Sequence, residues 1–143
     1  MRWRPIPHGR PTAKRSPVRW TDAGLGSIQT VGANGGAGRA VTKAAGHYAR
    51  PRFAPDGKTI VFEKGSGGNL VSPIASAEPG LYRVAIAGGE PVRFARDGEA
   101  PHFGAANDRI FFTTSDGKGA KLVSTDLDGE ARRTHAEGEM VNA

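Results

Sequence analysis

The sequence contains no cysteine and no acidic residue before position 22. Without cysteine, the chain can form neither a disulfide framework nor a cysteine-based zinc or iron–sulfur site. No apolar run approaches the roughly 18 residues of a membrane-spanning helix, so we expect no membrane span. Helical periodicity of useful length is also missing, which argues against a helical bundle.

Glycine and proline are abundant instead, with 21 and 10 copies in 143 residues. A share of about one fifth is high for a helical protein and usual for short strands joined by turns. The composition therefore predicts an all-β chain, and the length is that of one domain or of a piece of a larger protein.

Charge is concentrated at the N-terminus. The net charge is +6, and the first 20 residues hold six basic side chains and no acid, so 14 basic and 14 acidic groups balance in the remainder. A basic arm can bind phosphates non-specifically, but its prolines and low hydrophobicity favour a disordered tail over residues 1–17. We therefore do not expect nucleic acid as a partner. No apolar segment follows the basic residues, so no signal peptide is visible and the sequence leaves localisation open.

A tight turn at Pro55, Asp56 and Gly57 organises the middle of the chain. Proline presets the backbone for a turn, aspartate can accept a hydrogen bond from the backbone two residues on, and glycine supplies positive φ. Residues 59–63 after it are rich in the β-branched and aromatic residues typical of strands, and residues 50–53 before it form a second extended run. The segment therefore predicts a β-hairpin.

This pattern recurs along the chain. Residues 100–103 and 109–113 repeat the two strands of the hairpin at an offset of 50. A second turn, at Gly88 and Gly89, joins predicted strands at 81–86 and 90–94, and we match it to Asp128 and Gly129 at an offset of 40. The ten-residue difference falls in the loop 65–80, where an insertion costs little.

A period of 40–50 residues with four short strands per unit is the signature of β-propeller blades. We expect an all-β, partial β-propeller of two clear four-stranded antiparallel blades plus one eroded blade. The expected segments are a basic disordered tail at 1–17, an eroded partial blade at 18–44, blades at 45–95 and 96–137, and the start of a next blade at 138–143.

The residues of this repeat resemble a known family. Residues 51–62 (PRFAPDGKTIVF), 80–84 (GLYRV) and 88–94 (GGEPVRF) look like the TolB-type propeller repeat of bacterial proteins. The resemblance covers residues 45–143 and implies that the Pro-Asp-Gly turn joins the two inner strands of a blade and the Gly-Gly turn the outer two. Residues 63–68 and 127–135 look most like propellers fused to a C-terminal amidohydrolase domain, and such proteins are usually exported to the periplasm.

No catalytic, cofactor-binding or metal-binding constellation stands out in the sequence. His47 and His102 flank predicted inner strands and could face a propeller channel, although a structural role is the favoured interpretation. The glycine-rich residues 32–38 lack the ending of a phosphate-binding loop, and the alternating acids at 126–130 fall short of a calcium loop. We interpret both as turns. The loop 65–80 is the best candidate for binding, with a tolerated insertion as the favoured alternative.

The sequence therefore predicts a non-catalytic scaffold or binding segment of a β-propeller. The expected partners are the remaining blades and a C-terminal hydrolase domain of a larger bacterial protein. The alternative is that the parent is a metal-dependent amidohydrolase whose catalytic domain is absent from these residues, and no cofactor is expected in this chain.

Overall fold

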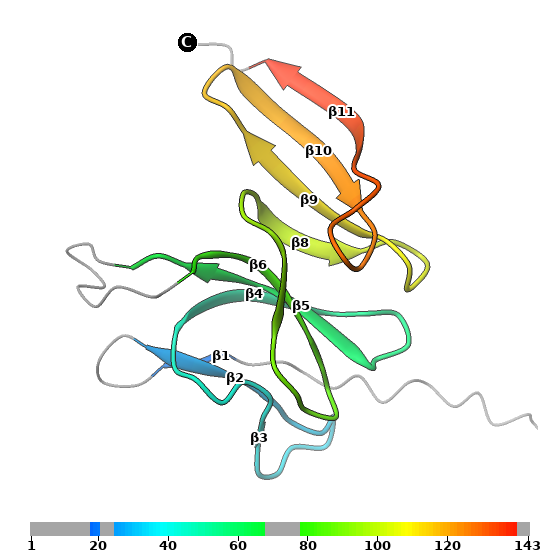
Figure 1. Cartoon of the computed structure of the whole chain (residues 1–143). Coiled ribbons are helices and arrows are strands. Elements are labelled where there is room, and N and C mark those ends of the chain that lie inside the picture. The colour runs from blue at the N-terminus through cyan, green and yellow to red at the C-terminus, as the bar shows by residue number, and fades with distance from the viewer. Residues whose placement is uncertain (1–17, 21–24, 68–77, 140–143) are drawn as a thin grey trace, which may run out of the picture.

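The computed structural model describes residues 18–20, 25–67 and 78–139, and all its elements there are strands (Figure 1). They form three antiparallel sheets with the orders β1-β2-β3, β4-β5-β6-β7 and β11-β10-β9-β8. The expectation of an all-β fold with two four-stranded antiparallel sheets is confirmed. The strands are β1 Val18–Trp20, β2 Gly26–Thr30, β3 Arg39–Ala40, β4 His47–Phe53, β5 Thr59–Gly65, β6 Gly80–Ala85, β7 Val92–Ala95, β8 Glu99–Phe103, β9 Ile110–Ser115, β10 Gly119–Thr125 and β11 Arg133–Glu139.

Several expectations fall on residues outside this description. The predicted tail at 1–17, the last four residues and the centre of the loop 65–80 belong to the undescribed part of the chain. Strand β11 runs to Glu139 and therefore includes the first two residues of the segment 138–143, which was expected to start a next blade. The other four residues of that segment lie outside the described part of the chain. Across the described ranges, no helix could cross a membrane.

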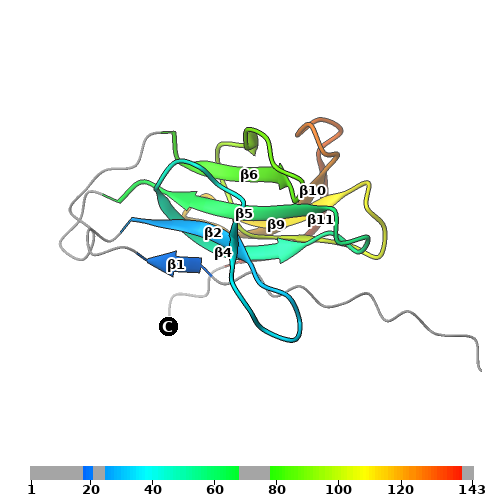
Figure 2. The same cartoon turned by 90° about the horizontal axis from the view of Figure 1, so that it is seen from below.

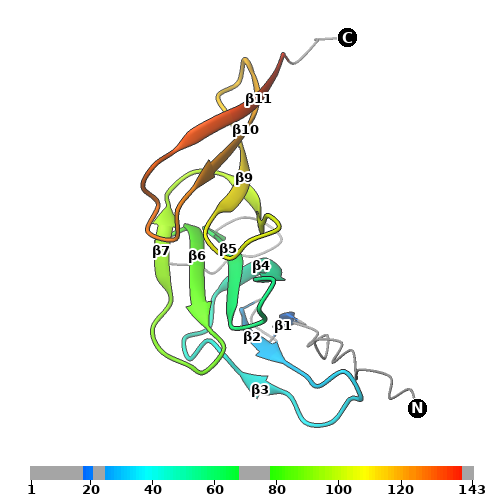
Figure 3. The same ribbon diagram turned by 90° about the vertical axis from the view of Figure 1, so that its right-hand side faces the viewer.

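The three sheets stack in chain order. Strand β4 contacts both β2 of the first sheet and β8 of the third. Seen from the side of the first sheet, β1 and β2 lie in front of β4 and β5 (Figure 2). Seen edge-on, β3, β7 and β11 follow one margin of the stack and β4 lies on the other side (Figure 3). We call the face that a sheet turns toward the next sheet in chain order its forward face, and the opposite one its rear face.

The alternation of side chains along β5 builds two cores. Ile60 and Phe62 are fully buried and pack toward the first sheet, whereas Val61 between them is fully buried toward the third. Successive side chains of a strand point to opposite faces, so the second sheet buries apolar residues on both sides. The core between the first two sheets contains Ile28, Val41, Tyr48, Ile60, Phe62, Tyr82 and Val84, and that between the last two contains Val61, Leu81, Phe94, Ile110, Phe112 and Val123.

Strand register corrects the predicted repeat by one residue. Phe62 pairs with Tyr82, and its equivalent Phe112 pairs with Val123, so the third strands of the two blades are offset by 41 residues and not by 40. The predicted offset was wrong because it matched Gly-Gly to Asp-Gly by composition alone. A slip of one residue matters, since it transfers every side chain to the other face of the sheet.

The innermost strands β4 and β8 carry equivalent bulges. Arg50 and Ala100 have positive φ values of 49° and 52°, and each precedes a proline. The ladder register shifts at both places. Positive φ is uncommon outside glycine, so neighbouring contacts must hold this backbone.

Candidate functional site

The predicted turn at residues 55–57 connects two blades as well as two strands. Gly57 has a φ of 69° and donates its N–H to the Ala54 carbonyl at 2.8 Å. The Asp56 carboxylate accepts the Lys58 N–H at 2.9 Å. The Asp56 N–H donates to the side-chain oxygen of Asn107, 2.9 Å away in the corresponding turn of the third sheet. The inner turns of neighbouring blades are therefore hydrogen-bonded to each other.

The outer turns also contain glycines with positive φ, and one of these turns contacts the neighbouring sheet. Gly88 and Gly89, between β6 and β7, have φ values of 110° and 120°, and Gly129, between β10 and β11, has 82°. A Cβ on Gly129 would overlap the carbonyl oxygen of Phe94. The outer turn of the third sheet therefore lies against β7 so closely that only glycine fits, and this turn is part of the contact between sheets.

The glycine-rich residues 32–38 form the outer turn of the first sheet. They connect the antiparallel strands β2 and β3, with positive φ at Gly35 and Gly36. The next element is a strand and not a helix, so no helix N-terminus is present there to hold a phosphate. The interpretation of this segment as a turn is confirmed.

The acidic residues at 126–130 are used within their own turn and by the neighbouring sheet. The Asp126 carboxylate accepts the N–H groups of Asp128 and Glu130 at 3.0 and 2.8 Å. The Asp128 carboxylate forms an ion pair with Arg83 at 3.0 Å. Within the described ranges, no group of three or more metal-ligating side chains that could hold a metal ion occurs.

Glu63 links the two bulges of the inner strands. Its carboxylate accepts a hydrogen bond from Arg50 at 2.8 Å and one from the Ala100 N–H of the third sheet at 2.9 Å. Arg50 also reaches Glu99, 3.3 Å away. The hydrogen bond and charge of Glu63 raise the pKa of Arg50. The carboxylate thus helps to hold both left-handed residues in place.

Two arginines reach from one sheet to the outer turn of the next. Arg39 of β3 donates to the Ala87 carbonyl at 3.1 Å. Arg83 of β6 donates to the Leu127 carbonyl at 2.6 Å, besides its ion pair with Asp128. These contacts were not predicted. They depend on which face of its strand each arginine occupies, and residue type alone does not show that.

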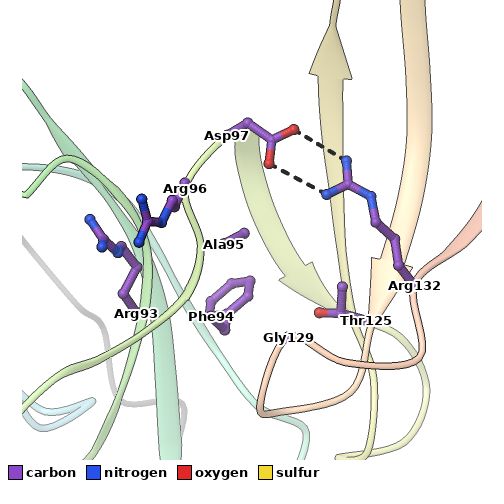
Figure 4. A pocket seen from close by; sticks show the side chains of 8 residues that line it. All are labelled: Arg93, Phe94, Ala95, Arg96, Asp97, Thr125, Gly129 and Arg132. Atoms are coloured by element: carbon purple, nitrogen blue, oxygen red, sulfur yellow. Dashed lines mark hydrogen bonds and ion pairs between the residues drawn. The ribbon is translucent and has the colours of Figure 1, made fainter.

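A cleft of about 450 Å³ opens between the outer parts of the second and third sheets (Figure 4). Asp97 and Arg132 span it with a two-pronged ion pair of 3.2 and 3.4 Å, and the Arg132 hydrogen bond lowers the pKa of Asp97. Arg93 and Arg96 point away from Arg132, so the three guanidinium groups do not converge on one ligand. The ion pair therefore acts mainly as a connection between the sheets.

A smaller cleft of about 190 Å³ lies beside the bulges and includes the predicted residue His102. His102 is exposed on β8, its Nδ1 lies 3.0 Å from the Ala100 carbonyl, and its ring stacks on Phe111 at 5.9 Å. His47, the other predicted residue, is buried at the start of β4. The channel-facing role of both histidines stays a prediction. The remaining lining residues are Arg50, Arg52, Ala100 and Pro101.

Ser124 and His135 form a pair that sequence spacing did not reveal. The Ser124 hydroxyl lies 2.7 Å from His135 Nε2, and it accepts hydrogen bonds from Nε and Nη2 of Arg109 at 3.0 and 2.9 Å. With both lone pairs occupied, its own hydrogen is directed to His135. Ser124 is fully buried, so no substrate can reach this oxygen. The pair has the residue types of a nucleophile and its base. However, the hydroxyl is inaccessible, and Arg109 already occupies the lone pairs with which it would attack a substrate.

Comparisons with known proteins agree with this geometry. No protein-family model matches the chain, and no curated protein matches its sequence. Solved structures do match. Putative TolB from Agrobacterium tumefaciens is 18% identical with a TM-score of 0.64, over 88% of this chain and 46% of that one. TolB from Acinetobacter baumannii is 16% identical with a TM-score of 0.62, over 82% of this chain and 28% of that one.

A third match is the β-propeller domain of the Trilobed protease from Pyrococcus furiosus, described as having an open velcro topology. It is 15% identical with a TM-score of 0.55, over 87% of this chain and 38% of that one. The fold is that of a TolB-like β-propeller segment. The chain spans less than half the length of each of these three structures. At such identities the likeness establishes the fold alone.

Proposed function

We propose that this chain is a non-catalytic scaffold segment of a β-propeller, whose task is to hold blades together and to bind protein. One observation carries the proposal: polar side chains of the kinds that could take part in catalysis instead form contacts between one sheet and the next. Glu63 binds the Ala100 N–H, Arg83 binds the turn at Asp128, and Arg132 binds Asp97. Side chains engaged in this way contribute packing and register between blades.

The partners follow from the same proposal. In a longer parent protein, the chain packs against further blades of the propeller. The resemblance of residues 63–68 and 127–135 to amidohydrolase-fused propellers adds a hydrolase domain as a second partner, within an exported bacterial protein. Metal-dependent amide hydrolysis then belongs to that domain and not to the sheets described above.

An activity assay on the purified 143-residue chain tests the proposal. We expect no hydrolysis of amide substrates above background with added Zn²⁺, because the described residues contain no group of three metal-ligating side chains. The Ser124 hydroxyl is also buried and bound by Arg109. The control variants are Ser124→Ala and His135→Ala. Turnover by the native chain that either variant abolishes would overturn the non-catalytic assignment.

A further inference from the structure

Several turns of the described residues place a side-chain carbonyl group directly before a glycine. The residues concerned are Asn34, Asp56, Asp97, Asp116 and Asp128. In such a pair, the side-chain carbonyl carbon lies within reach of the backbone nitrogen of the next residue, and the two can react. Glycine favours the reaction, because it has no Cβ to hinder the approach and its backbone adopts many conformations.

The four aspartates of this set are held in place. The carboxylates of Asp56 and Asp116 accept backbone N–H groups at distances of 2.9 to 3.2 Å. Those of Asp97 and Asp128 form ion pairs with arginines at 3.2 and 3.0 Å. A charged carboxylate also resists attack by a nitrogen nucleophile. These four pairs are therefore poorly disposed to react.

Asn34 differs from the aspartates in charge, exposure and bonding. Its side chain is an uncharged amide, it is exposed in the outer turn of the first sheet, and it makes no hydrogen bond within the described residues. Gly35 and Gly36 follow it with positive φ values of 83° and 109°. A Cβ on either glycine would meet no heavy atom within 4 Å, so the turn has open space around it.

Asn107 is the other asparagine in the described ranges, and its environment is the opposite. Its side-chain oxygen accepts the Asp56 N–H at 2.9 Å, which fixes the amide in the contact between two inner turns. The next residue is Asp108, whose Cβ hinders access to its own nitrogen. The structure therefore separates one reactive asparagine from one protected asparagine.

We propose that Asn34 is a site of spontaneous deamidation through a succinimide. The Gly35 nitrogen loses its proton and attacks the side-chain carbonyl carbon of Asn34. The new C–N bond closes the ring, and the side-chain amide leaves as ammonia, which carries the proton away. Water then opens the ring at either of its carbonyl groups and yields aspartate or isoaspartate. The net reaction consumes water and releases ammonia.

One hydrogen bond of the turn opposes this reaction. The Gly35 N–H donates to the Gly32 carbonyl at 2.9 Å, and this bond must open before the nitrogen can lose its proton. The N–H and the carbonyl can both bind water when the turn opens, since Gly32 and Gly35 are exposed. Exposed turns with few buried contacts open at a small cost in free energy. The bond therefore slows the reaction without preventing it.

The product changes both the charge and the length of this turn. Residues 32–38 contain no ionisable side chain, so the new carboxylate is the first charge within them. Isoaspartate also directs the main chain through the side-chain carbon and lengthens the turn by one backbone atom. Strands β2 and β3 pair beside the turn at Thr30 with Arg39 and at Gln29 with Ala40. We expect isoaspartate to loosen this short pairing.

The test incubates the folded full chain at pH 8 and follows the tryptic peptide of residues 20–39 by mass spectrometry. The expected mass change replaces NH₂ by OH at Asn34, and an isoaspartyl methyltransferase detects isoaspartate. Gly35→Ala should slow the reaction roughly tenfold, which equals about 1.4 kcal/mol of activation free energy, because its Cβ hinders the nitrogen. The matched control Gly36→Ala, also at positive φ in open space, should change the rate little.

The peptide of residues 97–109, which contains Asn107, is the internal control and should stay unmodified over the same period. A parallel sample in guanidinium chloride shows how fast Asn34 reacts once the turn is unfolded. Reaction of Asn34 in that sample alone would overturn the proposal, because the folded turn would then be too rigid. Equal rates for the native chain and Gly35→Ala would exclude the succinimide route. These outcomes are independent of the proposed scaffold function.

Discussion

The second and third sheets have the same strand order and differ in what covers them. The second sheet is packed on both faces, with Phe62 on one side and Val61 on the other, and both residues are fully buried. The third sheet has the same pattern in Phe112 and Phe111, but only Phe112 is fully buried. Equivalent positions thus have different environments, because burial of the forward face depends on a neighbour.

This difference shows where the fold is held together. A blade cannot bury both of its faces alone, so stability comes from contacts between neighbours as much as from each sheet. The aromatic cluster Tyr48–Phe62–Tyr82, with centroid distances of 5.3 and 5.8 Å, lies in one of these contacts. The three predictions below break or sharpen the comparison, starting with the largest effect.

Truncation of fully buried and of partly buried phenylalanines should lower the free energy of unfolding by different amounts on the covered and the open face of a sheet. Phe62→Ala and Phe112→Ala each remove a fully buried ring and should lower the free energy of unfolding by about 3–5 kcal/mol. Phe111→Ala removes a partly buried ring and should cost about 1 kcal/mol. Urea denaturation followed by circular dichroism measures all three. An equal loss for Phe111→Ala would mean that its face is already covered in solution.

Alanine substitutions at two glycines test the close contact between the outer turn and β7 separately from the backbone conformation. Gly117 and Gly129 have nearly equal φ values of 81° and 82°, but a Cβ would meet nothing within 4 Å at Gly117 and the Phe94 backbone at Gly129. Gly117→Ala should cost about 1 kcal/mol for the left-handed conformation. Gly129→Ala should cost roughly 3 kcal/mol, because the turn must also move away from the second sheet. Matching unfolding midpoints for the two variants would contradict the contact.

The ion pair between Asp97 and Arg132 should make stability depend on pH. The pKa of Asp97 is lowered by the Arg132 hydrogen bond, so its stabilising effect is complete above the ordinary value of 3.8 and is lost as the pH falls through the lowered pKa. Both side chains are largely exposed, which limits the effect to about 0.5 kcal/mol. Asp97→Asn should remove this part of the acid transition in thermal melts between pH 2 and 6. An unchanged transition would show that the pair is not formed in solution.

Much of the fold could be predicted because turns and strands depend on local chemistry. Pro55, Asp56 and Gly57 restrict the backbone by themselves, and the β-branched and aromatic residues at 59–63 indicate a strand. The contacts of the candidate site were harder to predict from the sequence. Ser124 and His135 are eleven residues apart and meet only because β10 and β11 pair with a register shift between Leu122 and Val123.

The sequence by itself determined the all-β class, the inner and outer turns, and the recurrence of a four-strand unit. These features follow from the φ preferences of proline and glycine and from the period of two in side-chain direction. Only the tertiary structure decided that the offset is 41 residues, that Glu63 joins two bulges, and that the forward face of the third sheet is open. Those depend on how sheets pair and stack, since one residue of register decides which side chains a neighbour covers.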